Sequence, residues 1–107
     1  MIRGEVWWVE FPVALNGEIR KTRPCVVVSN DVANRHLNRI QMVPLTTKIA
    51  KVFASEALVQ VRGKTHKAMA DQIHTASKRR VKNRFGKIAA SDMQKIEQAI
   101  KVQLDLT

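Results

Sequence analysis

The stretch Pro24-Cys-Val-Val-Val-Ser-Asn-Asp31 decides the fold. Its first half is wholly apolar, which is typical of a central strand buried on both faces, and a proline fits the start of such a strand. Cys25 is therefore expected in the core, and as the single cysteine it cannot form an internal disulfide. The Ser-Asn-Asp end has turn and helix-cap chemistry, which predicts a short helical turn over residues 31–36.

Other short strands are predicted on both sides of this stretch. Runs of β-branched, aromatic or alternating residues predict strands over residues 5–11, 39–46, 56–62, 68–75 and 84–89. Ala57, Val59 and Val61 alternate with other positions, which predicts a sheet with one wet face. Trp7 and Trp8 face opposite sides of their strand. One is expected in the core, and the other either stacks on a base or packs at a dimer interface.

The end of the chain predicts one helix. Ser91 and Gln94 have the spacing of a capping box with Ser91 as the N-cap. The apolar stripe of this helix consists of Met93, Ile96, Ile100 and Leu104. Strands followed by one helix favour an antiparallel barrel or an α+β domain over a parallel α/β sheet. Because no linker or repeat interrupts the pattern, residues 1–107 are expected to form a single domain.

The net charge of the 107 residues is +10, from 19 Lys and Arg against 9 Asp and Glu. The excess is concentrated in residues 62–87, where nine basic side chains accompany Asp71 alone. This basic band predicts a polyanion as partner, because each neutralised phosphate releases a counterion. An acidic protein partner and a merely solvated face are the alternatives. No apolar run could cross a membrane, and Glu5 and Glu10 stand where a signal peptide would be basic and then apolar, so a cytoplasmic protein is expected.

The sequence lacks the usual cofactor and metal signatures. It has no Gly-rich phosphate loop, no Cys-x-x-Cys pair and no His-Glu-x-x-His, and its three histidines have no ligand spacing, so no metal or cofactor is predicted. Cleavage of RNA by attack of its own 2′-OH needs neither a metal nor a cofactor. It needs a base that accepts the 2′-OH proton, an acid that protonates the leaving 5′-oxygen, and hydrogen-bond donors that stabilise the charge on the phosphorane. Arg23, Thr46, Glu18 and Asp71 are the candidates for these roles, although each also suits a structural role.

Several segments, in order, resemble the MazF/PemK family, the toxin ribonucleases of bacterial type II toxin–antitoxin pairs. The matching segments are Arg3-Gly-Glu-Val-Trp7, Gly17-Glu18, Thr22-Arg-Pro24, Cys25 to Asp31, Val43-Pro-Leu-Thr-Thr47, Asp71-Gln-Ile-His-Thr75 and Gly86-Lys-Ile88. They span nearly the whole chain.

The resemblance implies a small SH3-like antiparallel β-barrel with a C-terminal helix, assembled as a homodimer. It implies an endoribonuclease (mRNA interferase) that cuts single-stranded RNA, chiefly mRNA, at specific sequences without a metal, leaving a 2′,3′-cyclic phosphate and a 5′-OH. It also implies inhibition by a cognate antitoxin with an acidic, flexible segment. A CcdB-like toxin that does not cut RNA, or a nucleic-acid-binding module on the same fold, is the alternative.

By the same resemblance, Arg23 is the catalytic arginine and Thr46 its partner, with Glu18 and Asp71 as auxiliary carboxylates. The residues expected to hold the RNA are Asn16, Lys21, Thr47, Lys48, Gln72, His74, Lys78 and Arg79. Two positions depart from the family pattern: His74 stands where many members have arginine, and Met69 where some have arginine. His74 either replaces that arginine in substrate contact or is a packed, non-catalytic residue.

Overall fold

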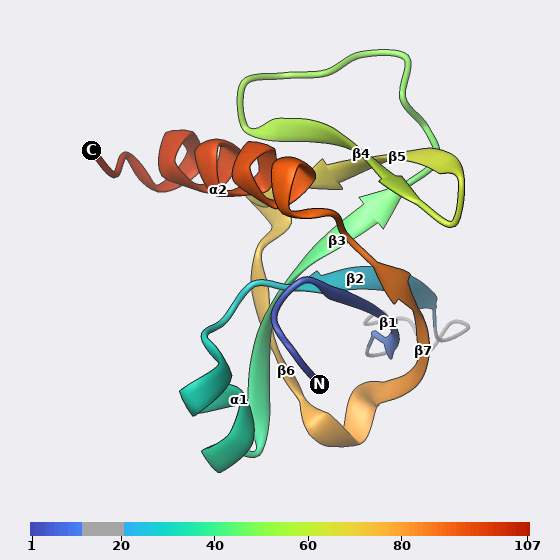
Figure 1. Ribbon diagram of the computed structural model, residues 1–107, viewed down its shortest axis with the longest axis vertical. Coiled ribbons are helices and arrows are strands. Elements are labelled where there is room, and N and C mark those ends of the chain that lie inside the picture. Colours follow the sequence, from blue (N-terminus) through green and yellow to red (C-terminus); the bar gives the residue numbers. More distant parts are fainter. Residues whose placement is uncertain (12–20) are drawn as a thin grey trace, which may run out of the picture.

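Antiparallel strands build most of the molecule in the computed structural model, which describes residues 1–11 and 21–107 (Figure 1). The strands are β1 (Glu5–Glu10), β2 (Thr22–Val27), β3 (Arg39–Thr46), β4 (Glu56–Val61), β5 (Lys64–Met69), β6 (His74–Ser77) and β7 (Val81–Lys87). The helices are α1 (Asp31–His36) and α2 (Ala90–Leu104), with 3₁₀ turns η1 (Ala70–Gln72) and η2 (Lys78–Arg80). Neither α-helix of this described part is long and apolar enough to span a membrane.

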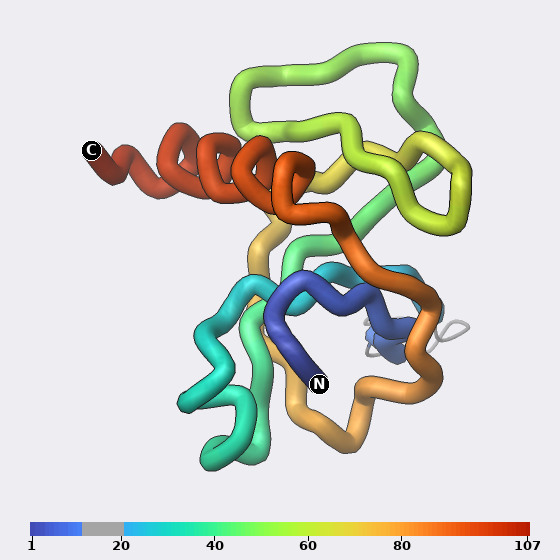
Figure 2. The backbone as a smooth tube through the Cα atoms, in the orientation of Figure 1, coloured from blue at the N-terminus to red at the C-terminus, as the bar shows by residue number. Residues whose placement is uncertain are grey.

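The strands form one curled sheet in the order β4-β5-β3-β2-β1-β7. Strand β3 connects the two parts of this sheet, because its first half pairs with β6 and its end pairs with β5. The sheet therefore curls around β3, and Figure 2 shows α2 lying beside the part of the sheet formed by β4 and β5. The predicted fold class, mainly antiparallel β with a C-terminal helix, is confirmed.

The apolar stretch that begins at Pro24 lies in the middle of the sheet and is covered on both faces. Cys25 and Val27 point into one core cluster, while Val26 points into the other. Two-sided burial explains why this strand has no alternating polar positions. Cys25 is fully buried, as predicted, and burial raises the pKa of its thiol to about 12, against the opposing charge of Arg23.

Helix α1 forms where the cap residues predicted it. The Asn30 side-chain oxygen accepts a hydrogen bond from the Ala33 N–H at 2.8 Å. This bond satisfies one of the backbone donors that the first turn leaves free.

Helix α2 begins two residues earlier than predicted, because its N-cap is Ala89 rather than Ser91, and no side chain caps it. The predicted capping box is therefore wrong, because Ser91 lies inside the first turn. The Asp92 carboxylate instead reaches β4, the edge strand, and accepts a hydrogen bond from the Gln60 N–H at 2.9 Å. The predicted apolar stripe is buried at Met93 and Ile96 but leaves Leu104 49% exposed.

The single strand predicted over residues 68–75 is also wrong. Strand β5 ends at Met69, η1 follows, and β6 begins at His74. The chain changes partners along β3, from Leu45 opposite Ala68 to Met42 opposite His74. Pro44, which has no N–H for a ladder, lies in β3 between these two pairings. The strand predicted over residues 68–75 would have placed Asp71 and Gln72 on opposite faces of the sheet. Both residues instead lie in the 3₁₀ turn η1.

Candidate nucleic-acid interface

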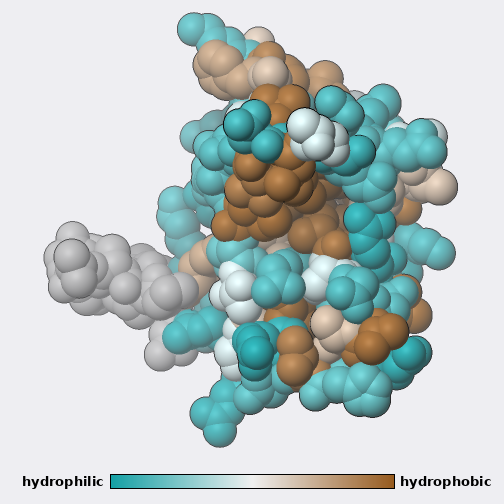
Figure 3. Space-filling view, turned by 90° about the vertical axis from the view of Figure 1, so that its left-hand side faces the viewer, coloured by the Kyte–Doolittle hydropathy of each residue, from teal (hydrophilic) through white to brown (hydrophobic). Residues whose placement is uncertain are grey.

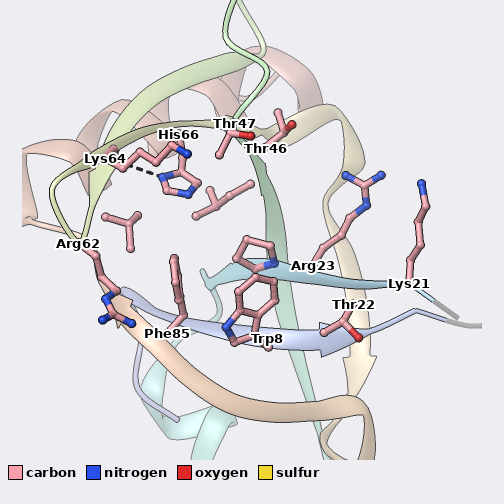
Figure 4. A pocket seen from close by; sticks show the side chains of 13 residues that line it. Trp8, Lys21, Thr22, Arg23, Thr46, Thr47, Arg62, Lys64, His66 and Phe85 are labelled. Carbon is pink, nitrogen blue, oxygen red and sulfur yellow. Dashed lines mark hydrogen bonds between the residues drawn. The ribbon is translucent and has the colours of Figure 1, made fainter.

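A groove of about 570 Å³ opens at the end of the sheet where β2 begins and β3 ends (Figure 4). Its lining includes the apolar residues Pro24, Leu45 and Val61. Its rim carries basic and hydroxyl side chains from β2, β3 and the β4–β5 hairpin. A lining that is partly apolar and partly cationic suits a ligand with both flat apolar surfaces and negative charge.

Arg23 and Thr46 come together in this groove from neighbouring strands. The antiparallel register pairs Cys25 with Pro44, and the same register continued by two residues places Arg23 opposite Thr46. Both side chains line the groove, and Figure 4 shows them on the same side of it. The structure therefore brings together the two residues that the sequence made the centre of the candidate site.

The hydroxyl of Thr46 is oriented by the chain that follows it. Its oxygen accepts a hydrogen bond from the Lys48 N–H at 3.2 Å, so the hydroxyl proton is available to an acceptor in the groove. Lys21 and Thr47, both predicted to hold RNA, also line the groove. Lys48 contributes its backbone to this arrangement, while its side chain is not part of the lining.

The opposite wall of the groove is aromatic, and most of it was missed in the sequence. Trp8 and Phe85 meet edge to face with ring centroids 5.2 Å apart, and His66 meets Phe85 at 6.0 Å. The Arg62 guanidinium carbon lies 5.5 Å from the centre of the Phe85 ring. Phe85 lies in β7 and His66 in β5, so only the closure of the half-barrel brings them together.

The two tryptophans divide as the alternation predicted. Trp7 packs against the core cluster around Cys25, and its indole N–H donates to Glu5 at 3.2 Å. Trp8 faces the groove. Its role in base stacking or in a dimer interface stays a prediction.

The Asp71 segment lies outside the groove. Asp71 and Gln72 form part of η1, and the Gln72 amide donates to the Met69 sulfur at 3.5 Å. His74 packs on Phe11 with ring centroids 4.9 Å apart. Their predicted contacts with RNA are thus not supported by a shared cavity with Arg23.

His74 is partly buried, and its two ring nitrogens differ. Nδ1 lies 3.3 Å from the Gln72 carbonyl oxygen, while Nε2 is buried with no hydrogen-bond partner in the described part of the chain. Burial lowers the pKa of His74 below its ordinary 6.5, although the Gln72 carbonyl opposes this change. This environment favours the interpretation of His74 as a packed, non-catalytic residue over a role in contacting the substrate.

Lys78 and Arg79 also lie away from the groove, in η2. The Lys78 ammonium donates to the Asn34 carbonyl, which ties η2 to α1. Asn16 and Glu18 fall outside the described residues.

Some basic side chains form ion pairs within the described part of the chain, and others do not. Arg84 contacts Glu5 at 2.9 Å, and Lys67 contacts Glu56 at 3.4 Å. Among residues 1–11 and 21–107, by contrast, no ion pair involves Lys21, Arg23, Arg62 or Lys64, the cations of the groove. The groove therefore holds four cations that no described carboxylate pairs, and Lys78, Arg79, Arg80, Lys82 and Lys87 outside it are also without an ion pair among the described residues.

Glu5 is the carboxylate that fixes the β1–β7 edge beside the groove. Burial raises its pKa, but hydrogen bonds from the Ile2 N–H, the Trp7 indole and Arg84 outweigh this effect. The net result is a pKa below the ordinary value, so Glu5 stays ionised and keeps Arg84 paired.

The structure is that of a small half-barrel protein with a cationic groove. A family described as PemK-like, MazF-like toxins of type II toxin–antitoxin systems matches residues 2–104. The chain belongs to this family.

Individual relatives agree with this assignment. The chain is 36% identical over 115 residues to endoribonuclease MazF9 of Mycobacterium tuberculosis, an alignment that covers 99% of this chain and 98% of that protein. An endoribonuclease from a mycobacterial species, solved in complex with its cognate antitoxin, has a TM-score of 0.83 at 26% identity and covers 100% of this chain and 97% of its own. A MazE–MazF structure from Deinococcus radiodurans has a TM-score of 0.84 at 20% identity, covers 100% of this chain and 97% of its own, and shows the shared fold.

Proposed function

We propose that this toxin is a metal-independent, sequence-specific endoribonuclease and that the Arg23–Thr46 groove is its cleavage site. The observation that carries the proposal is the cross-strand placement of Arg23 and Thr46 on a groove whose cations have no ion-pair partner among the described residues. The substrate is single-stranded RNA, because a groove with a partly apolar lining suits unpaired bases while its rim suits phosphates.

The 2′-OH of the substrate is the nucleophile in this mechanism. Its oxygen bonds to phosphorus, the bond from phosphorus to the 5′-oxygen breaks, and the products are a 2′,3′-cyclic phosphate and a 5′-OH. Arg23 stabilises the charge on the phosphorane and can deliver the proton to the leaving 5′-oxygen, while the Thr46 hydroxyl donates to a non-bridging oxygen. Glu18 or Asp71 is the candidate to accept the 2′-OH proton, and Asp71 would have to act from outside the groove.

The partners of the toxin follow from the same surfaces. The cognate antitoxin would place an acidic, flexible segment over the cationic groove and so compete with RNA. A homodimer would bury the apolar surface at the end of α2, where Figure 3 shows hydrophobic side chains gathered and where Val102, Leu104 and Leu106 are exposed. A toxin that cuts mRNA would act in the cytoplasm, and we propose this location for the protein.

A long transcript incubated with the purified toxin and EDTA tests the proposal. Discrete fragments with 5′-OH ends are expected from the wild type, and mapping those ends gives the recognised sequence. Arg23→Ala should cut about 100- to 1,000-fold more slowly, the usual cost of losing a preorganised donor to the developing charge.

Arg39→Ala is the matched control, because Arg39 is an exposed arginine at the other end of β3 and does not line the groove. Its cleavage rate should stay near that of the wild type. Intact RNA with the wild-type toxin would instead favour a CcdB-like toxin that does not cut RNA. Arg23→Ala activity within tenfold of wild type would remove the role of Arg23.

A further inference from the structure

The aromatic end of the groove holds a buried histidine that the cleavage chemistry does not use. His66 is 4% exposed and lines the groove from β5. Its Nδ1 lies 3.1 Å from the Lys64 carbonyl oxygen. A carbonyl only accepts, so Nδ1 carries the proton and Nε2 of the neutral ring is an acceptor. No hydrogen bond among the described residues involves Nε2.

The surroundings of His66 form a flat, apolar surface with one cation. Figure 4 shows His66 on one side of this end of the groove and Trp8 and Phe85 on the other. Both aromatic rings are only half-buried, so each keeps an accessible surface. Arg62 lies over Phe85 and adds a guanidinium to the same wall.

The backbone is unusual where it builds this wall. Arg62 and Gly63 form the two-residue turn between β4 and β5, with φ of 51° and 76°. Asn or Gly normally occupies the first of these positions, because a left-handed conformation is unfavourable for a long side chain. An arginine held there is a strained residue of the kind that concentrates at functional sites.

Gly86 supplies a second special position in the same wall. A Cβ at residue 86 would lie 2.9 Å from a Val61 methyl carbon and 3.4 Å from the Arg62 Cγ. The absence of a side chain lets β7 approach the β4–β5 turn closely. This approach places Phe85 under the Arg62 guanidinium.

We propose that His66, Phe85, Trp8 and Arg62 form a base-binding subsite that selects the nucleotide beside the phosphate held at Arg23. The base stacks on the aromatic wall, and its exocyclic amino group donates to His66 Nε2. The subsite therefore prefers a base with an amino group (adenine, cytosine or guanine) over uracil. This inference rests on the proposed function, because it identifies the nucleotide as part of the RNA substrate.

Binding of non-cleavable oligonucleotides tests the subsite separately from cleavage. The probes are 2′-O-methyl RNAs of the mapped recognition sequence, or of one fixed sequence if the toxin cuts no RNA, each with one position changed in turn to adenine, cytosine, guanine or uracil. The wild type should discriminate against uracil at one position flanking the cut. His66→Phe keeps a ring and removes the acceptor, and it should lose about 5- to 10-fold discrimination at that position alone. His66→Gln offers an amide oxygen in place of Nε2 and should keep part of the discrimination.

Phe85→Leu removes the stacking surface. Its affinity should fall about 5- to 140-fold for any base at that position. Phe53→Leu is the matched control, because Phe53 is 64% exposed and does not line the groove, and its affinity should not change. Arg62→Asn keeps a residue suited to the left-handed turn and removes the cation over Phe85. Its affinity for the same probes is measured if the His66 variants do not fold.

The outcomes separate the two proposals. Cleavage by the wild type together with unchanged discrimination in His66→Phe overturns the subsite and leaves the proposed function standing. If His66→Phe is unfolded, unchanged affinity in Arg62→Asn, which lacks the cation over Phe85, has the same meaning. Discriminating binding without cleavage overturns the proposed function and supports the subsite. An equal loss of affinity in Phe53→Leu and Phe85→Leu also overturns the subsite.

Discussion

The Arg23–Thr46 groove and the Asp71 segment both carry residues that the sequence assigned to one site, yet they use their polar groups differently. In the groove, the described residues leave the guanidinium of Arg23 and the hydroxyl proton of Thr46 available to a ligand. In the Asp71 segment, backbone bonds from Ala70 to Ser55 and from Ile73 to Ala70 hold a 3₁₀ turn. This turn carries the chain from β5 to β6, beneath helix α2.

The difference separates two ways in which a polar residue contributes to this molecule. The Arg23 guanidinium and the Thr46 hydroxyl proton have no partner among the described residues and so can bind substrate, whereas backbone hydrogen bonds of the turn set the path of the chain. The groove is therefore expected to carry the chemistry, and the Asp71 segment beneath α2 is expected to stabilise the fold. Variants in each region test that division.

The largest effect is expected in the groove, for Thr46→Val. Valine keeps the shape of threonine and removes the hydroxyl donor, so cleavage should slow by about 100-fold. Single-turnover cleavage of the mapped RNA measures it. Thr75→Val, on exposed β6, is the control and should change the rate less than tenfold. Equal rates for Thr46→Val and wild type would mean that the groove lacks its second donor.

In helix α2, which covers the Asp71 segment, Asp92→Ala should change stability and leave cleavage per folded molecule unchanged. The Gln60 N–H would lose its acceptor, which costs about 1–3 kcal/mol in the free energy of unfolding. Urea denaturation measures the loss. Asp92→Asn keeps an acceptor oxygen and should restore most of it, while Lys95→Ala breaks only an exposed ion pair and should cost at most about 1 kcal/mol.

Asp71→Asn is expected to slow cleavage less than tenfold, because Asp71 does not line the groove. The same single-turnover assay, run beside Thr46→Val, compares the two regions directly. A loss as large as that of Thr46→Val would break the comparison and make Asp71 part of the catalytic centre.

The smallest effect concerns His74 and depends on pH. Because burial keeps its folded pKa below 6.5, the unfolded chain binds the proton more readily. The stability linked to His74 is therefore complete above about pH 6.5 and falls as the pH drops through that value toward the lower folded pKa. His74→Phe should lose this part of the pH dependence in urea denaturation at pH 5 and pH 8. An identical pH dependence in wild type and variant would refute the assignment.

Local patterns predicted most of the strands correctly. The wholly apolar stretch after Pro24 predicted the central position of β2 in the sheet, and the alternation of Ala57, Val59 and Val61 predicted the buried face of β4. The pairing of Arg23 with Thr46 followed from a family resemblance and is explained by the register between β2 and β3. These features depend on residues close in sequence or on a simple antiparallel pairing.

The features that the sequence did not predict depend on distant parts of the chain. The turn at Asp71 forms because β3 changes partners, which no local pattern of residues 68–75 indicates. His66 escaped notice because residues 64–67 were not assigned to a strand. The Arg62–Gly63 pair, which separates β4 from β5, was the available signal for a hairpin there.

Cys25 has a practical consequence for experiments on this toxin. Its thiol is buried in the middle of the sheet and its pKa is about 12, so at neutral pH it hardly forms the thiolate that reacts with maleimides. A cysteine introduced at an exposed position such as Lys48 would therefore be the single reactive site of the folded protein. A fluorophore attached there could report RNA or antitoxin entering the groove without removal of the native cysteine.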